Sequence, residues 1–390
     1  MKPGDYTLHM LIQKVKDLDF GEDNDNANKV VVEVEVQRKT ETSKVIENVT
    51  STSVVDLDHH VFFELLGQSV ADLDQTKILI KVLKKGYFKA NLIGQVELDL
   101  TYIYNLDNHT KEHTWMAMIN PNSEDFSSVA AYIKMSGSVY GVDDTPVELK
   151  MDDKDDSDDC VMPASIKPKY TQLLMHIVKG EKLPKLDVKM IGEGSMDAFV
   201  TAKIGGKLIK TKIVKTVHDE ATWNQTFMIP IRMPIMSGKL VLNVMDLDGI
   251  NDEQAGALIF DYKDLLDRPQ KSFFWANIYG APGQEEVKVF DANSDLADEM
   301  NKDPVKATKW KGRILIGIEH IADTESPKLG VEPMSANPPT EKDENGKDVP
   351  SIELPITEQA KKFTAPQKYK LMYEFNSCIN IPEHEGKYNL

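Results

Sequence analysis

Three carboxylates follow an apolar strand in the segment VLNVMDLDGINDEQAG, residues 241–256. Asp246 and Asp248 lie two residues apart, and Asp252 follows four residues after Asp248. Residues two apart on an extended strand project to the same side, so Asp246 and Asp248 would face one pocket. Calcium takes roughly 6–8 oxygen ligands, and carboxylates from separate loops supply many of them. The pattern therefore indicates half of a cation site, and the alternative is a merely acidic turn.

A matching stretch earlier in the chain lacks these carboxylates. In ILIKVLKKGYFKANLIG, residues 78–94, Lys84 and Lys85 stand where the paired aspartates would be. An ammonium group has no oxygen to give a metal, so this copy is predicted to be calcium-independent. Tyr87 and Phe88 at the turn are candidates for insertion into a bilayer or a partner pocket. The alternative is that these two aromatic side chains only pack the loop.

A basic strand precedes the acidic one, in the segment KIGGKLIKTKIVK. Its lysines are Lys203, Lys207, Lys210, Lys212 and Lys215. Clustered lysines on one face attract inositol phospholipid head groups or acidic proteins. The alternative is a solvated strand, because lysine is mostly exposed in folded proteins.

These residues lie on or beside short segments in which apolar and polar side chains alternate, which is the pattern of β-strands. Residues 5–141 and 168–320 each contain a series of them, and polar breaks separate the strands. The openings YTLHMLIQKVKDL (6–18) and YTQLLMHIVKGEKL (170–183) resemble each other, which indicates duplication of one domain. The predicted fold is all-β, with two antiparallel eight-stranded β-sandwiches.

The strand series and the segments between them divide the chain into five parts. We assign 1–141 and 168–321 to the two sandwiches, and 142–167 to an acidic linker that cannot bury a core. Residues 322–367 are predicted to be an extended Pro-rich linker. Residues 368–390 resemble the opening strand again, as part of a third unit or a docking segment.

Several stretches of the second copy resemble a C2 domain. They are SMDAFV (195–200), ATWNQTFMIPI (221–231) and VMDLDGINDEQAG (244–256). The tandem arrangement, with NLIGQVELDLTYIY (91–104) and WKGRILIGIE (310–319), resembles the N-terminal part of ferlins. The resemblance implies C2-type sandwiches and a calcium-responsive role in membrane trafficking. It also implies a calcium site in the second domain only, formed by Asp187, Asp197, Asp246, Asp248 and Asp252.

The composition excludes several classes of function. The chain has 390 residues and a net charge of −17, which disfavours non-specific nucleic-acid binding because phosphates are repelled. Its two cysteines, Cys160 and Cys378, match no zinc spacing and favour a reducing compartment. We find no signal peptide, no apolar run long enough for a transmembrane segment and no catalytic motif. The protein is expected to be a non-enzyme in the cytoplasm, peripheral to a membrane or the cytoskeleton.

Two functions follow from these patterns. The first is a peripheral, calcium-responsive module that binds anionic phospholipid membranes or proteins in membrane trafficking. The second is a calcium-independent C2 scaffold in a large cytoskeletal or ciliary assembly. The degenerate first copy, the acidic charge and the long linkers favour the second function, whereas the paired aspartates favour the first.

Overall fold

The computed structural model contains one compact unit, Met1–Glu353, and a second unit, Leu354–Leu390. Most of the second unit, including the predicted segment 368–390, lies outside the described residues. So do 152–167 of the acidic linker, and the site candidates Tyr87, Phe88 and Asp187. The described residues are 1–21, 27–86, 89–123, 128–151, 169–186, 194–248, 252–282, 295–335 and 337–355.

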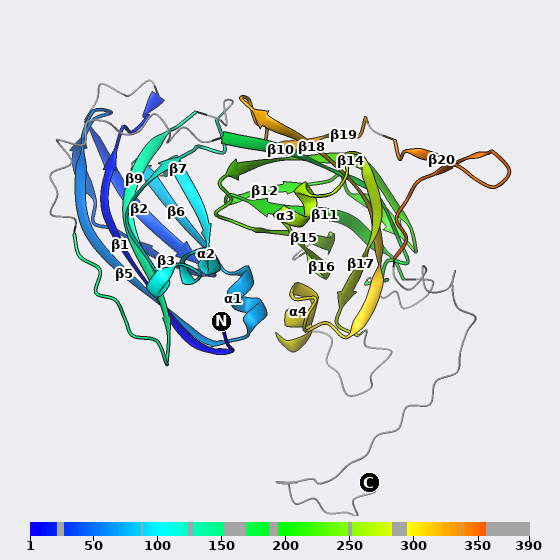
Figure 1. Ribbon diagram of the computed structural model, residues 1–390, viewed down its shortest axis with the longest axis horizontal. Coiled ribbons are helices and arrows are strands. Elements are labelled where there is room, and N and C mark those ends of the chain that lie inside the picture. Colours follow the sequence, from blue (N-terminus) through cyan, green and yellow to red (C-terminus); the bar gives the residue numbers. More distant parts are fainter. Residues whose placement is uncertain are drawn as a thin grey trace, which may run out of the picture. The chain divides into compact units, whose positions relative to one another are not determined.

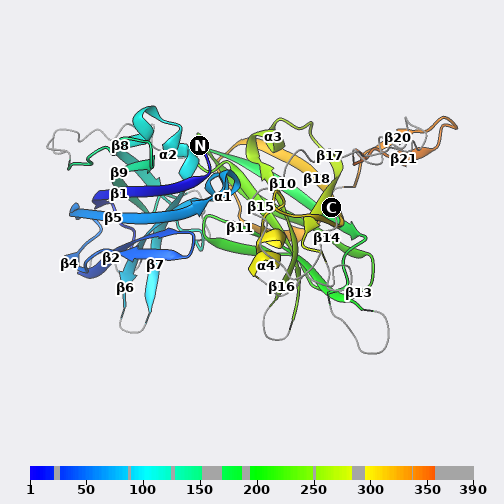
Figure 2. The ribbon, with the colours of Figure 1, turned by 90° about the horizontal axis from the view of Figure 1, so that it is seen from below.

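Two antiparallel sheets form the first sandwich (Figures 1 and 2). One sheet has the strand order β5-β1-β9-β8, and the other has the order β3-β2-β6-β7 with β4 beside β2. The strands are β1 (Gly4–Lys16), β2 (Asn28–Val36), β3 (Lys39–Thr42), β4 (Ile46–Val49), β5 (Val55–Gln68), β6 (Lys77–Lys85), β7 (Ala90–Asp99), β8 (Thr110–Met118) and β9 (Ala131–Gly141).

Alternating side chains from both sheets fill the space between them. Leu8, Met10 and Ile12 of β1 are fully buried, and Val32 and Val34 of β2 meet them in one core. This is the period-2 pattern expected when one face of each strand points inward. The alternation that the sequence shows in these strands therefore corresponds to the observed core.

The second sandwich has its own core, and its strands form one continuous sheet because β16 and β17 pair at Ala257 and Tyr279. Its strand order is β12-β11-β15-β16-β17-β18-β10-β14, with β13 beside β11. The strands are β10 (Lys169–Glu181), β11 (Met196–Ile204), β12 (Lys207–Lys210), β13 (Val214–Val217), β14 (Ala221–Met233), β15 (Lys239–Asp246), β16 (Glu253–Asp261), β17 (Ser272–Gly280) and β18 (Lys309–Thr324).

Short helices connect the strands. They are α1 (Val70–Gln75), α2 (Leu100–Tyr104), the 3-10 helix η2 (Asp107–His109), α3 (Tyr262–Leu266) and α4 (Asp295–Lys302). None of the helices in the described residues is long and apolar enough to cross a membrane. The prediction of an all-β fold is confirmed. Each described sandwich has nine strands rather than the expected eight, because two short strands follow β2 and two follow β11.

Strand pairing supports the duplication. β1 lies between β5 and β9, and β10 lies between β14 and β18. The β6–β7 pair has a register shift between Val82 and Leu83, and the β15–β16 pair has one between Val244 and Met245. Because the shifts occupy the same place in both copies, residues of the two sandwiches can be matched one by one.

Part of the segment predicted to be a linker packs on the second sandwich. β19 (Gly330–Pro333) pairs with the outer edge of β14. Glu353 exchanges backbone hydrogen bonds with β17, donating to Phe273 O (2.8 Å) and accepting from Trp275 N (3.1 Å). A short hairpin, β20 (Thr340–Lys342) and β21 (Asp348–Pro350), lies between them in sequence. An open sheet edge offers unpaired backbone groups, so a short segment without strand periodicity can still dock there.

Candidate cation site and lysine strand

Asp197 and Asp246 lie beside each other on neighbouring strands. Ala198 of β11 pairs with Asp246 of β15, which places Asp197 next to the end of β15. Asp246 is only 2% exposed, and its Oδ1 accepts a hydrogen bond from the backbone N–H of Asp197 at 2.6 Å. A buried carboxylate that accepts a backbone N–H is strongly held. Asp246 therefore fixes the end of β15 against β11.

The side chain of Asp197 is also held by backbone. Its Oδ1 accepts a hydrogen bond from the N–H of Thr216 at 2.8 Å, and its carbonyl oxygen accepts one from Leu247 N at 3.0 Å. Thr216 has a left-handed backbone, with φ of 54°, beside the short strand β13. Three chain segments thus meet at Asp197.

Asp248 and Asp252 do not join this pair in a metal-binding group among the described residues. Asp248 and Asp252 are exposed and lie on either side of residues 249–251, and Asp187 lies outside the described residues. Within the described part of the chain, no group of three or more His, Cys, Asp or Glu side chains is placed to hold a metal ion. The described residues supply two adjacent carboxylates, which is part of the oxygen set that calcium requires. The five-ligand calcium site stays a prediction.

Two of the five lysines in the basic segment 203–215, Lys203 and Lys207, contact the first sandwich. Lys203 Nζ lies 3.6 Å from Glu35 Oε1, and Lys207 Nζ donates a hydrogen bond to Pro121 O at 3.0 Å. Lys81 Nζ also reaches Glu35, at 2.6 Å from Oε2. Burial acts to raise the pKa of Glu35, but the hydrogen bond and charge of Lys81, with help from Lys203, hold it below its ordinary value.

The remaining three lysines are exposed, and we call them the free lysine edge: Lys210, Lys212 and Lys215. Lys210 Nζ lies over the Phe199 ring, 5.8 Å from its centroid. The predicted basic surface is therefore divided. The end next to the β11–β12 turn meets the first sandwich, and the end next to β13 faces solvent.

Sequence reasoning missed a buried polar network between the sandwiches. Lys77 forms an ion pair with Asp99 and donates a hydrogen bond to Ser237 Oγ at 2.6 Å. Asp99 also accepts a hydrogen bond from Gly238 N, and its own N–H donates to Met236 O at 2.8 Å. Asp99 is 6% exposed, so these contacts are shielded from water. We call this group the Lys77 network.

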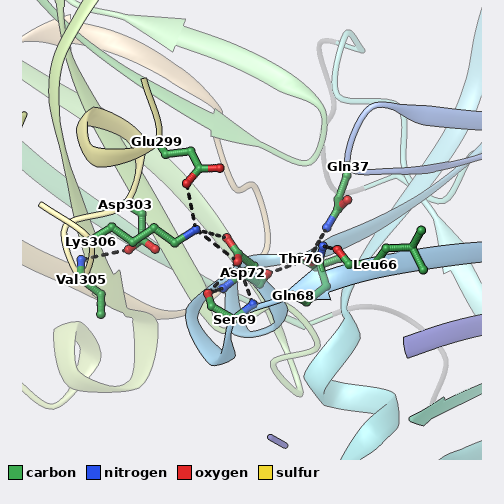
Figure 3. A network of polar contacts seen from close by, with 10 residues as sticks. All are labelled: Gln37, Leu66, Gln68, Ser69, Asp72, Thr76, Glu299, Asp303, Val305 and Lys306. Carbon is green, nitrogen blue, oxygen red and sulfur yellow. Dashed lines mark hydrogen bonds and ion pairs between the residues drawn. The ribbon is translucent and has the colours of Figure 1, made fainter. Parts of the chain in front are cut away.

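A second polar contact joins α1 of the first sandwich to the turn after α4 (Figure 3). Lys306 Nζ lies 3.4 Å from Asp72 Oδ2 and 3.5 Å from Glu299 Oε2. Asp72 also closes the capping box of α1 by accepting a hydrogen bond from Ser69 N at 2.9 Å. Burial raises the pKa of Asp72, yet Ser69 and Lys306 together hold it below its ordinary value. Nothing in the sequence spacing pointed to this pair, because the partners lie far apart in the chain.

Comparisons with known proteins bear on the whole arrangement. The C2 domain model matches residues 6–118 and 171–278, together more than half of the chain. Mouse myoferlin is 25% identical over 312 residues, which cover 71% of this chain and 15% of myoferlin. Ferlin 2 of Tetrahymena thermophila is 24% identical over 333 residues, which cover 74% of this chain and 19% of ferlin 2.

The chain thus spans less than a fifth of the length of these two relatives. Among solved structures, a pair of C2 domains from Extended-Synaptotagmin 2 matches at 13% identity with a TM-score of 0.28. That match covers 83% of this chain and 92% of the other. The C2 domain matches and the two ferlin relatives confirm the predicted resemblance to a tandem C2 protein of ferlin type, at low sequence identity.

Proposed function

Because this chain belongs to the C2 domain family, we propose that it is a non-catalytic, peripheral module that binds anionic phospholipid membranes in a calcium-responsive way. The second C2 domain carries the activity. The observation that carries the proposal is the Asp197–Asp246 pair, which concentrates two carboxylates where β11 and β15 end. Two adjacent carboxylates repel each other, so a cation is favoured beside them.

The membrane contact is built from two surfaces of the second domain. A calcium ion at the aspartates would supply positive charge beside the lipid phosphates. Asp197 and Asp246 hold the loop ends in place through backbone hydrogen bonds, so these ends need little reordering on binding. The free lysine edge adds positive charge that the described residues of the first domain do not contact. Each lysine near an anionic surface contributes about 1 kcal/mol, so three lysines make a substantial addition.

Ferlin-like organisation supports a place in membrane trafficking, at the cytoplasmic face of a membrane. The first domain is a calcium-independent partner of the second domain. Lys84 stands at the end of β6 in the register position that Asp246 occupies on β15. An ammonium group there cannot ligate a metal.

The second candidate function is a calcium-independent scaffold in a cytoskeletal or ciliary assembly. The Lys77 network and the contacts of Lys203 and Lys306 favour it, because they join the two domains through side chains of the protein itself. On this alternative, anionic lipid would not be the ligand, and acidic or apolar protein surfaces would take its place.

Liposome co-sedimentation distinguishes the two functions. Vesicles of phosphatidylcholine with a third of phosphatidylserine are mixed with the full chain, with calcium or with a chelator. We expect calcium-dependent binding that is lost in the Asp246→Asn/Asp248→Asn variant. Lys84→Gln in the first domain is the matched control and should leave binding unchanged. Equal sedimentation of wild type and the aspartate variant in both conditions would overturn the proposal.

A second arm tests the free lysine edge. Replacing Lys210, Lys212 and Lys215 by glutamine should weaken vesicle binding at physiological salt by about tenfold, because screening by salt reduces the contribution of roughly 1 kcal/mol per lysine. Lys203→Gln should change vesicle binding far less, since Lys203 faces Glu35. If Lys203→Gln weakened binding as much as the triple change, the division of the basic surface would be wrong.

A further inference from the structure

A cavity lies between the two C2 domains, and its walls come from both. The first domain contributes β7 and Ile119, and the second contributes the end of β11, the end of β14 and the turn after it. The lining residues that matter here are Gln95, Val96, Ile119, Ile204, Arg232 and Met236, and we call this space the inter-domain cavity. Its volume is about 100 Å³. A cavity of about 150 Å³ can hold benzene, so a space of about 100 Å³ has room only for a hydrocarbon group smaller than benzene.

Most of the cavity wall is apolar. Val96, Ile119, Ile204 and Met236 present hydrocarbon to it, and Val96 and Ile204 are 4% and 7% exposed. Such walls give water few hydrogen-bond partners, and they favour a hydrocarbon body over a chain of waters. The polar side chains that line the cavity are those of Gln95, Glu97, Tyr170, Arg232, Ser237 and Tyr262.

Gln95 is the first of these polar groups. Its side chain is 4% exposed, and Nε2 has no hydrogen-bond partner within the described residues. Leaving a buried amide donor unpaired costs about 1–3 kcal/mol, so such a group calls for an explanation. The Gly205–Gly206 turn packs against this amide, which keeps the side chain in place. A ligand oxygen in the cavity would satisfy the donor.

Arg232 is the second polar group. Its guanidinium donates one hydrogen bond, from Nη1 to Ala117 O at 2.6 Å, and meets no carboxylate within ion-pair distance in the described part of the chain. Arg313, by contrast, pairs with Glu181 at 2.7 Å, and Arg268 pairs with Glu353 at 2.8 Å. Burial lowers the pKa of Arg232, and the nearby Tyr170, Tyr102 and Tyr132 act in the opposite direction. A guanidinium has five donors, so most of them remain available for an anion.

The two donors belong to one neighbourhood. Gln95 pairs through its backbone with Ile119, and Arg232 bonds the carbonyl of Ala117, two residues earlier in the chain. Glu97, which also lines the cavity, accepts a hydrogen bond from Ser237 Oγ at 3.0 Å. Burial raises the pKa of Glu97, while the charge of Lys77 and the hydrogen bond from Ser237 act to lower it.

We propose that the inter-domain cavity is a binding site for a small monocarboxylate with a hydrocarbon body. The carboxylate accepts hydrogen bonds from Arg232 and Gln95, and the hydrocarbon lies against Val96, Ile119 and Ile204. Because both domains form the walls, an occupied cavity also strengthens their packing. The proposal is independent of calcium and of membrane binding.

Calorimetric titration of the full chain with butanoate, hexanoate and octanoate at pH 7 tests the site. We expect saturable binding with one ligand per chain, and a gain in affinity of about fourfold per methylene, equivalent to ~0.8 kcal/mol, until the cavity is full. Hexanol lacks the carboxylate and should bind at least tenfold more weakly than hexanoate. The absence of saturable binding by any of the three acids, or equal binding of hexanol and hexanoate, would overturn the proposal.

Two variants locate the site. Arg232→Gln should weaken hexanoate binding by about tenfold, and Ile204→Phe should abolish it by filling the space. Lys212→Gln, an exposed lysine outside the cavity, is the control and should bind hexanoate as the wild type does. The thermal midpoint of each variant is measured first, so that loss of folding is not mistaken for loss of binding. If a variant fails to fold, the comparison of hexanol and hexanoate on the wild type still decides. Undiminished binding by folded Ile204→Phe would place the ligand elsewhere and overturn the assignment.

Discussion

The two C2 domains of this chain share one register but carry opposite charges at the same position. Val30 pairs with Lys84 in the first domain, and Ala198 pairs with Asp246 in the second. Both strands that end there have the same register shift two residues earlier. The fold therefore does not require an aspartate at this place. The two domains share the backbone register at this position and differ in the charge of the side chain that occupies it.

The charges are also reversed between the domains at a second pair of matched positions, next to the first. Lys29 of the first domain forms an ion pair with Glu47 at 2.5 Å, and the register matches these residues with Asp197 and Lys215 of the second domain. The first domain thus balances its strand ends with its own charges. In the second domain Asp197 accepts a backbone hydrogen bond from Thr216 instead. At this loop end the second domain therefore has the carboxylates Asp197 and Asp246, where the first domain has Lys29 and Lys84.

The largest contrast concerns the cores. Trp223 is fully buried and donates from Nε1 to Ala198 O at 3.2 Å, whereas the register matches it with the half-buried Leu57 in the first domain. Trp223→Ala should lower the free energy of unfolding by about 3–5 kcal/mol. Leu57→Ala should lower it by about 1 kcal/mol. Urea unfolding followed by circular dichroism measures both changes. Equal losses of unfolding free energy would contradict the expected difference in core packing between Trp223 and Leu57.

Asp246 and Lys84 provide the next contrast. Asp246→Ala removes a buried acceptor from the N–H of Asp197 and should cost about 1–3 kcal/mol of unfolding free energy. Lys84→Ala should cost less than about 1 kcal/mol. Asp246→Asn keeps an acceptor oxygen and should restore most of the stability while still lowering calcium uptake in calorimetry. If Asp246→Ala were as stable as the wild type and took up calcium equally well, Asp246 would neither stabilise the strand end nor bind calcium.

Acid should affect the two domains unequally through their buried histidines. Burial, aided by His60, lowers the pKa of His9 from 6.5 to about 4, and His9 is 7% exposed. The unfolded chain binds a proton below about pH 6.5, whereas folded His9 does so only near pH 4, so stability falls as the pH drops between these values. His9→Gln should reduce this loss by about 1–2 kcal/mol after allowance for solvent screening.

His176 of the second domain is the matched test. Burial lowers its pKa too, but Glu319, 3.7 Å away, acts in the opposite direction. His176→Gln should therefore change the pH dependence less than His9→Gln. Unfolding midpoints in urea measured from pH 7 to pH 4 check this order. A larger effect at His176 would show that the Glu319 charge does not reach the imidazole.

The smallest effect is expected at the charge-reversed surface pair. Lys29 and Glu47 are both exposed, and solvent screens their attraction. Exchanging them, Lys29→Glu with Glu47→Lys, should leave the thermal midpoint of the chain unchanged. Calorimetric melting measures this, and a clear shift would mean that charge order at this loop end matters to folding.

The strands and the duplication could be predicted from the sequence, because period-2 alternation and residue spacing are local signals. The grouping of Asp197 with Asp246 came only from the resemblance to C2 domains, because no local signal joins two residues that lie 49 positions apart. The partners of Lys203 and Lys306 could not be predicted, since they depend on how the two sandwiches pack against each other. Arg232 gave no signal for the same reason: its sequence neighbours Ile231 and Met233 only indicate a strand. β19 was missed because four residues at a sheet edge are too short to show a period.

β19 has a consequence for how the second domain behaves outside its chain. It covers the outer edge of β14, whereas the equivalent β5 of the first domain is the last strand of its sheet among the described residues, and its Phe62 and Leu66 side chains are exposed. A fragment cut at residue 321, the boundary expected from the sequence, would lose this cover. Its bare β14 would then be a template for strand addition between copies. The unit suited to isolation, and to any assay of a single domain, therefore extends through Glu353.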